Sequence, residues 1–310
     1  MHEQTAKRFN RPSGSSTRLF LKKNFFNIMV LLPAVAYIGI FFLIIVINLI
    51  VFSFTNYVGG FAQEPTLLNY TRVLASPEFQ QAYTRTLAFM LVVTPLQLIT
   101  GLIVASLLNK SFRGRGIARG VMLIPLALPV LVTASVFFIL FSKNGHINAL
   151  LLGQYPFFPK LINAPVTFIG TANGSFILTV CAKVWRDTPA SVLILLAGMQ
   201  SIDGVQYEAA KTMGAKPMQT FLYITVPLLI PSISSVLVLR SIEAWKEFVF
   251  PYILAPSFPL LSVIIDRYFT QQRDPGITAV VGLILIASIV IFSQILKFLL
   301  SLIQKRLLRV

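Results

Sequence analysis

Apolar residues run along this chain in long stretches that are separated by short polar segments. Six stretches, at 28–54, 84–109, 117–142, 174–200, 220–242 and 278–304, are each mostly apolar. A helix needs about 20 residues to cross the roughly 30 Å hydrocarbon core of a membrane, and each stretch is long enough to do so. The pattern predicts an all-α, polytopic membrane protein with six transmembrane helices.

Composition supports this class. Of the 310 residues, 56% are hydrophobic and 12% are charged, whereas soluble domains have about 45–50% apolar and about 25% charged residues. The first stretch is too long for the apolar region of a signal peptide, and no small-residue cleavage site follows it. We therefore expect it to be a true membrane span.

The net charge of +16 could indicate a nucleic-acid partner, but its distribution favours a membrane. Basic residues form short clusters beside the spans: Lys7, Arg8, Arg11, Arg18, Lys22 and Lys23; Lys110, Arg113, Arg115 and Arg119; and Lys305, Arg306 and Arg309. Such clusters are typical of cytoplasmic segments. No base-stacking or groove-reading motif accompanies them, so we expect no nucleic-acid partner.

Loop charge also predicts the orientation and the division of the chain. We expect a cytoplasmic basic tail at 1–27, a first transmembrane helix at 28–54 and a periplasmic loop at 55–83. A domain of five helices follows at 84–304, with a cytoplasmic loop at 201–219, and a cytoplasmic tail closes the chain at 305–310. Both termini then face the cytoplasm, and the loops near 143–173 and 244–277 face outward.

Prolines recur within the predicted spans, at Pro33, Pro95, Pro125, Pro129, Pro189, Pro227 and Pro231. Each removes a backbone hydrogen bond and favours a bend. Helices that bend and rock would explain them. The alternative is that proline is simply more frequent in membrane helices than in soluble ones.

The chain has few of the residue types that bind metals or act as nucleophiles in enzymes. It has one cysteine, Cys181, and two histidines, His2 and His146, so we expect no disulfide and no metal site. It contains no HExxH, GxSxG or GxxxxGK[ST] motif. We therefore predict no catalytic residues, no enzyme activity and no nucleotide cofactor bound by this chain.

The polar segment between the fourth and fifth spans reads VQYEAAKTMGAKPMQTFLYITVPLLIP at 205–231. Its first half favours a short helix, which Glu208 could support by pairing with Lys211 or by capping the first turn. Gly214 is suited to ending that helix, and Pro217 to the first turn of the next. We predict a helix, a turn and a second helix that enters the membrane near Met218. The small side chains favour docking in a groove of another protein.

The spacing of this segment resembles a known signature. Glu208-Ala209-Ala210, Gly214-Ala215, Phe221 and Pro227 have the spacing of the EAA signature of binding-protein-dependent ABC importer permeases. Residues 184–202 and 68–89 are similar to spans of the maltose-type carbohydrate importers, and the resemblance extends over nearly the whole chain from residue 28. Met213, Asp203 and the 244–254 segment AWKEFVFPYIL depart from the common pattern, so the resemblance leaves open which of two permease positions the chain fills.

This resemblance implies a type I ABC importer transmembrane domain in the inner (cytoplasmic) membrane. It implies a permease subunit that carries a sugar or oligosaccharide and works with two ATPase subunits, a second permease and an extracytoplasmic solute-binding protein. ATP would be bound by the ATPase subunit. The residues implied to couple transport to the ATPase are Tyr207, Glu208, Ala209, Ala210, Gly214 and Ala215.

Charged and aromatic residues within the spans are candidates for the solute pathway: Trp185, Arg186, Asp187, Arg240, Glu243 and Trp245. A charge near the bilayer centre costs about 2.5–3.5 kcal/mol, so it faces a cavity or a partner. Neighbours on a helix point about 100° apart, so Arg186 and Asp187 are not expected to pair. Arg240, Glu243 and Glu247 share one helix face. Pairing between helices and contact with a polar solute both explain these charges.

The two tryptophans are candidates for contact with a sugar. Trp185 and Trp245 could stack on a sugar ring, although interfacial anchoring is favoured for Trp245.

Two other functions stay open as alternatives: a permease for another polar solute, such as glycerol 3-phosphate or a polyol, and a secondary transporter driven by an ion gradient. The secondary transporter would explain the charges within the spans but not the EAA spacing.

Overall fold

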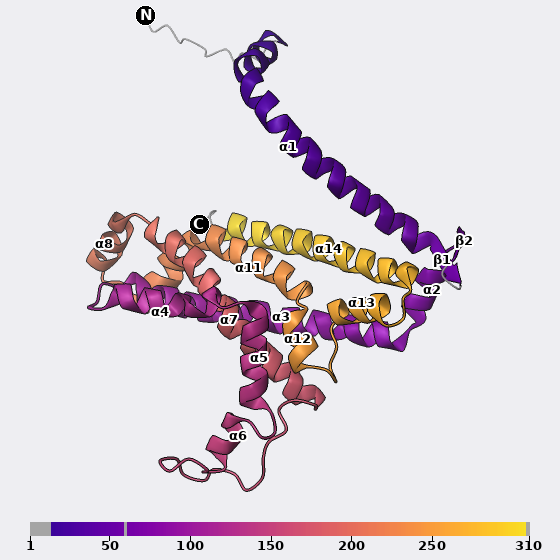
Figure 1. The fold of residues 1–310 in the computed structure, drawn as a ribbon. Coiled ribbons are helices and arrows are strands. Elements are labelled where there is room, and N and C mark those ends of the chain that lie inside the picture. The colour runs from indigo at the N-terminus through magenta and orange to yellow at the C-terminus, as the bar shows by residue number, and fades with distance from the viewer. Residues whose placement is uncertain (1–13, 59–60, 308–310) are drawn as a thin grey trace, which may run out of the picture. The chain divides into compact units, whose positions relative to one another are not determined.

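The computed structural model describes residues 14–58 and 61–307, and it is mostly helical (Figure 1). The first 13 residues of the predicted N-terminal tail and residues 308–310 of the predicted C-terminal tail lie outside the described residues. The described parts of both predicted tails are helical, because α1 (Gly14–Phe54) and α14 (Pro275–Leu307) extend into them. The polar tail sequences therefore continue the helices instead of ending them.

The chain divides into two units. Residues 1–51 form the first unit, in which α1 contains Pro33 and is apolar along the predicted first span. Residues 52–310 form the second unit, which contains every other helix and strand described.

Strands and helices occupy the start of the second unit, at 55–83, where the sequence predicted a loop. Strands β1 (Thr55–Val58) and β2 (Phe61–Pro65) pair antiparallel, with Tyr57 opposite Ala62. Helices α2 (Leu68–Ala75) and α3 (Pro77–Asn109) follow. Ser76 caps α3 by accepting a hydrogen bond from the Phe79 N–H.

The predicted single span at 117–142 is wrong, because two helices occupy it. Helix α4 (Arg115–Ala127) ends before Leu128 and Pro129, and α5 (Val130–Phe141) then takes a different direction (Figure 1). Pro129 has no N–H and disfavours a helical conformation in the residue before it, which explains the break. The short α6 (His146–Leu151) comes next.

The fourth predicted span is continuous and the fifth is broken. Helix α7 (Ala172–Gln200) covers the fourth and bends by 69° into α8 (Gly204–Thr212). The predicted fifth span contains α9 (Pro217–Thr220), a π-helix η1 (Phe221–Thr225), α10 (Val226–Leu228) and α11 (Ile230–Trp245). The chain bends by 68° at Leu229, between Pro227 and Pro231. The bend expected from Pro227 and Pro231 is therefore present, since both prolines disfavour regular helix there.

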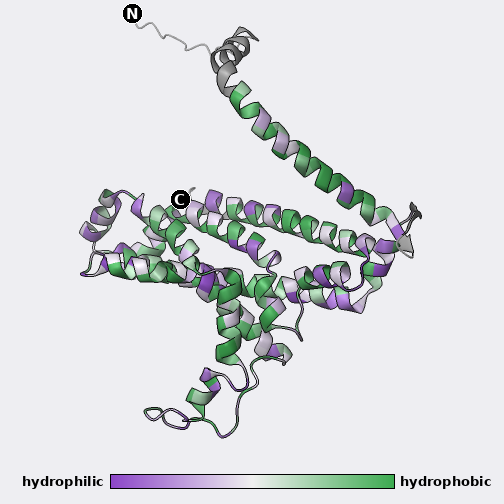
Figure 2. Cartoon of the chain, in the orientation of Figure 1, coloured by the Kyte–Doolittle hydropathy of each residue, from purple (hydrophilic) through white to green (hydrophobic). Residues whose placement is uncertain are grey.

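Two short helices, α12 (Val249–Leu254) and α13 (Leu261–Thr270), connect α11 to α14. Among the described residues, four helices are long and apolar enough to cross a membrane, or up to six if each bent pair counts as one span. Figure 2 shows hydrophobic residues along most of α3, α5 and α14, and hydrophilic residues gathered on α8.

Helices α3 and α7 pack closely through small and polar positions. A Cβ on Gly101 of α3 would lie 3.1 Å from the Ser191 Cβ, so the two backbones are near each other. The buried Gln97 side chain donates to the Lys183 carbonyl at 3.2 Å. Close approach at small residues and hydrogen bonds between helices are the usual means of association inside a membrane.

The two ends of this bundle differ. At one end lie the hairpin, α2 and α13; at the other lies α8 (Figure 1). At the first end, the Tyr268 hydroxyl of α13 donates to Glu78 of α3 at 3.3 Å. Burial raises the pKa of that hydroxyl above its usual value, so it stays a proton donor. Packing around Val73, Phe79 and Ile264 fixes this end.

Candidate functional site

The helix that carries the EAA residues, α8, starts at a side-chain cap. Asp203 Oδ1 accepts a hydrogen bond from the Val205 N–H at 3.0 Å. A cap of this kind satisfies one of the free N–H groups of the first turn. The residue that departs from the family pattern at 203 therefore has a clear local role in starting α8.

The end of α8 is set by Gly214. Its φ of +77° lies in the left-handed region, which glycine adopts without strain. The Gly214 N–H donates to the Lys211 carbonyl, and the Ala215 N–H donates to the Ala210 carbonyl, both at 3.0 Å. Pro217 then starts α9. The predicted helix, turn and second helix are confirmed.

Side chains on α8 separate into an inner and an outer face. Ala210 is buried against the rest of the protein, while Glu208 and Ala209 are exposed. The Tyr207 hydroxyl lies 3.3 Å from the Thr225 hydroxyl in the π-helix. Helix α8 is therefore joined to the start of the fifth span and keeps the Glu-Ala pair on its surface.

The expected role of Glu208 within the chain is wrong. It forms no ion pair with Lys211 in the part of the chain that the structure describes, and Asp203 caps the helix in its place. Apart from Gly214 itself and its two chain neighbours, no described residue has an atom within 4 Å of a Cβ built on Gly214. Both residues face open space, as a docking surface for another protein requires.

Apolar side chains surround this surface. Met213 and Tyr223 are strongly exposed, and a hollow of about 440 Å³ lies between the end of α8 and η1. Ala210, Gly214 and Tyr223 are among its lining residues. An exposed apolar patch beside a concave surface is typical of a protein-binding site.

The charges of the fourth span form one buried cluster. Lys183 pairs with Asp187 at 2.7 Å on the same helix face, and with Glu247, which follows α11. Arg186 Nη1 lies 2.6 Å from Asp187 Oδ1, so the expectation that these neighbours would not pair is wrong. The long, flexible arginine side chain turns back toward Asp187 and overcomes the 100° offset.

Glu247 connects this cluster to two further elements. Its side chain accepts a hydrogen bond from the Phe250 N–H at 3.2 Å at the start of α12, and its carbonyl accepts one from Ser262 in α13. Lys183 and Glu247 thus join α7 to the segment after α11. The sequence interpretation considered Glu247 only with Arg240 and Glu243, and it left out Lys183, although the i, i+4 spacing of Lys183 and Asp187 was a visible signal.

Arg240 and Glu243 form a second pair on α11, at 2.8 Å. Arg240 is buried, whereas Glu243 is partly exposed. The helix face predicted for all three is wrong for Glu247, because α11 ends at Trp245 before reaching it. Glu247 pairs with Lys183 and leaves Arg240 to Glu243. The three residues therefore do not act as one group.

The two tryptophans occupy different environments. Trp245 is 2% exposed, and its ring contacts those of Tyr83 and Phe292, so it does not lie at an interface as expected. Trp185 is 45% exposed, and its ring lies 5.7 Å from that of Phe137. Of the two tryptophans, only Trp185 presents a ring face that a ligand can reach.

No group of three metal-ligating side chains occurs among the described residues.

Comparison with known proteins gives consistent matches. Residues 97–309 match the family described as binding-protein-dependent transport system inner membrane component. The chain is 31% identical to the trehalose/maltose transport system permease protein MalF of Thermococcus litoralis, over 86% of this chain and 90% of that protein. It is 28% identical to the arabinooligosaccharides transport system permease protein AraP of Bacillus subtilis, over 89% of each.

A solved structure shares the fold. A chain of a bacterial alginate ABC transporter, crystallised in complex with an alginate pentasaccharide-bound periplasmic protein, superposes with a TM-score of 0.75 at 20% identity. The match covers 92% of this chain and 97% of the other. At this identity the similarity concerns the fold.

Proposed function

Because this chain belongs to the family of inner membrane components of binding-protein-dependent transport systems, we propose that it is the permease of an importer for a sugar or oligosaccharide. The resemblance seen in the sequence and the all-α ABC importer fold are confirmed. The chain is a multi-pass inner membrane protein that works with an ATPase and a binding protein, and it is a transport subunit, not an enzyme.

The finer assignments belong to the proposal. Two ATPase subunits bind ATP, a second permease completes the pathway, and both termini face the cytoplasm. The carbohydrate class is supported by relatives that are named for trehalose, maltose and arabino-oligosaccharides. Glycerol 3-phosphate or a polyol is the alternative solute.

The observation that supports the proposal most directly is the solvent-exposed face of α8, which points away from the rest of the chain. Glu208 and Ala209 are exposed on a capped helix at one end of the bundle, and Gly214 is exposed directly after it. The Glu208 carboxylate forms no ion pair among the described residues. We propose that this face docks in a cleft of the ATPase, and that Tyr207 passes its movement to the π-helix through Thr225. π-helical turns are frequent at functional sites.

Three of the predicted pathway residues, Trp185, Arg186 and Glu243, have exposed or partly exposed side chains, and we propose that these meet the solute. Asp187 and Arg240 are buried and hold Arg186 and Glu243 in place through the ion pairs described above. Trp245 would act indirectly, through packing.

The test is ATP-driven uptake of labelled maltose, trehalose or arabino-oligosaccharide by the complete transporter in proteoliposomes that contain its binding protein. Gly214→Val forces a branched side chain into the left-handed region at the docking surface. We expect at least a tenfold loss of uptake, with the permease still present in the membrane. Gly204→Ala is the matched control, because Gly204 is also in this loop, faces open space and has no positive φ.

Uptake by Gly214→Val at the wild-type rate would contradict the docking role. Uptake that continues without the ATPase subunit would favour an ion-gradient transporter. Transport of glycerol 3-phosphate in preference to every sugar tested would contradict the carbohydrate class.

A further inference from the structure

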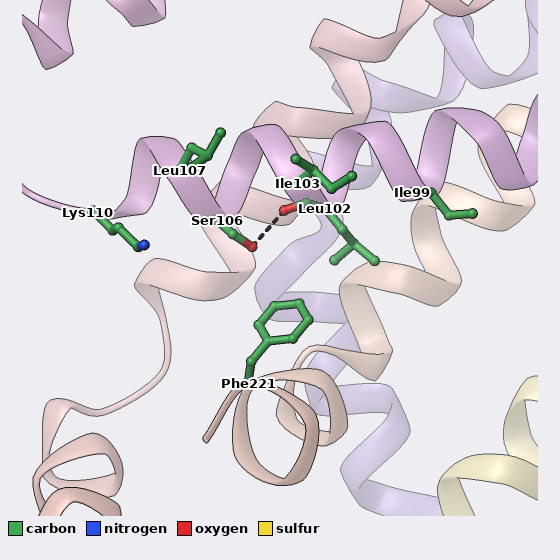
Figure 3. A pocket seen from close by; sticks show the side chains of 7 residues that line it. All are labelled: Ile99, Leu102, Ile103, Ser106, Leu107, Lys110 and Phe221. Atoms are coloured by element: carbon green, nitrogen blue, oxygen red, sulfur yellow. Dashed lines mark hydrogen bonds between the residues drawn. The ribbon is translucent and has the colours of Figure 1, made fainter. Parts of the chain in front are cut away.

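Two adjoining hollows lie where the end of α3 meets the EAA segment. The first has a volume of about 400 Å³ and is lined by Ile99, Leu102, Ile103 and Leu107 of α3, with the Phe221 ring opposite them (Figure 3). The second, of about 840 Å³, lies between the end of α3, α8 and the start of the fifth span. Ser106, Lys110 and Phe221 line both, so the two hollows are continuous.

The two hollows differ in chemistry. Apart from Lys110, the first is lined by apolar side chains and by Ser106, whose hydroxyl already donates to the Leu102 carbonyl at 2.6 Å (Figure 3). Lys110 and Lys211 are among the residues that line the second, together with Asn109 and Thr220. A mainly apolar hollow thus adjoins a hollow that two lysines line.

The two lysines have no anionic partner in the described part of the chain. No carboxylate lines either hollow, and no ion pair of Lys110 or Lys211 exists in the described residues. Two uncompensated positive charges in one concave site favour a ligand that carries negative charge.

The length of the first hollow indicates what the apolar part of such a ligand would be. From residue 99 to residue 107 the helix rises about 12 Å, which is most of the roughly 15 Å depth of one membrane leaflet. The lysines follow at the point where α3 ends, with Lys110 as its C-terminal cap residue. A ligand that fits both hollows has an acyl chain along α3 and an anionic group beside the lysines.

We propose that this site binds an anionic phospholipid of the cytoplasmic leaflet, with its headgroup between Lys110 and Lys211 and an acyl chain between α3 and Phe221. Basic pockets between membrane helices on the cytoplasmic side are suited to anionic headgroups. The inference rests on the proposed orientation. Since Lys211 and Phe221 belong to the EAA segment, the lipid would contact the element proposed to couple transport to the ATPase.

The first test is native mass spectrometry of the assembled transporter, titrated with phosphatidylglycerol or with phosphatidylcholine of the same chains. Each lysine near an anionic headgroup contributes about a fivefold increase in affinity. We therefore expect Lys110→Gln with Lys211→Gln to weaken phosphatidylglycerol binding about 30-fold. Lys216→Gln with Lys305→Gln is the control, because both lysines are exposed and line neither hollow. Unchanged binding by the first pair, or equal binding of the two lipids, would overturn the proposal.

A second measurement does not depend on the lysine variants. Ile103→Trp places an indole in the apolar hollow, and Ile124→Trp places one on the exposed surface of α4. Brominated phosphatidylglycerol should quench the first more strongly than brominated phosphatidylcholine does, and the second equally. Equal quenching at Ile103→Trp, or a photocrosslinker at this position that captures the second permease, would contradict the lipid site. ATP-driven uptake by the same wild-type preparation tests the proposed function separately.

Discussion

At the scale of single residues, buried charge explains the composition of the fourth span. Lys183, Arg186, Asp187 and Glu247 bring two positive and two negative charges together. A buried charge that loses its partner destabilises a protein by about 3–5 kcal/mol, so a neutral cluster is what makes these charges tolerable inside a bilayer. Arg186 is the member that solvent can partly reach, and therefore the one able to meet a solute.

The two tryptophans should respond differently to truncation. Trp245→Ala empties a buried ring cluster and should lower the free energy of unfolding by about 3–5 kcal/mol, seen as earlier thermal unfolding of the purified transporter. Trp185→Ala should leave thermal stability unchanged and raise the KM for the solute, because its ring is exposed. If Trp185→Ala leaves uptake unaltered, its ring faces lipid or a partner subunit.

At the scale of elements, the close crossing of α7 and α11 sets the position of α8. A Cβ on Gly198 would lie 2.1 Å from Ser232 Oγ and 2.8 Å from Leu229 Cδ1. The two helices therefore touch at the last turn of α7, directly before the chain bends into α8. Leu229 is also the position of the bend in the fifth span, so one contact joins both bends.

A methyl group at this crossing should separate the helices. Gly198→Ala is expected to cost about 1–3 kcal/mol by overpacking and to reduce ATP-driven uptake. Gly120→Ala is the matched control: it lies inside α4 with open space around it, and it should be neutral or stabilising by about 0.5–1 kcal/mol. Ser232→Gly combined with Gly198→Ala should recover part of the loss. A Gly198→Ala protein as stable as wild type would contradict close packing at this point.

At the scale of the whole molecule, two side-chain contacts and one bend connect α8 to the charge cluster of α7. Tyr207 joins α8 to η1, the bend at Leu229 leads into α11, and Glu247 after α11 joins α7 through Lys183. Movement of α8 would therefore reach the charge cluster through elements that already contain a π-helix and a bend. Regular straight helices would lack these points at which the chain can flex.

The orientation of the second unit can be tested by labelling. With Cys181 replaced by alanine, a membrane-impermeant maleimide should label Phe157→Cys in spheroplasts and Met213→Cys only in inside-out vesicles washed with urea. These positions are 94% and 87% exposed, so the reagent can reach both. Helix α7 lies between them in sequence and should place them on opposite sides of the membrane. Labelling of both from the same side would contradict the predicted topology.

The sequence by itself determined the membrane class, the approximate position of the spans, and the helix, turn and second helix around Gly214. These features follow from local chemistry: the length of an apolar stretch, the conformational freedom of glycine, and the fixed φ of proline. The EAA spacing also identified the family, because it lies within one short segment.

Only the tertiary structure decided which charges pair, which tryptophan is buried, and how the third and fifth spans break. Arg186 could have pointed away from Asp187, and Lys183 meets Glu247 only because α7 packs beside the segment after α11. The hollows beside Phe221 likewise exist only between elements that are distant in the chain. The physical reason is that such contacts depend on how helices pack, and packing is fixed by side chains from several helices at once.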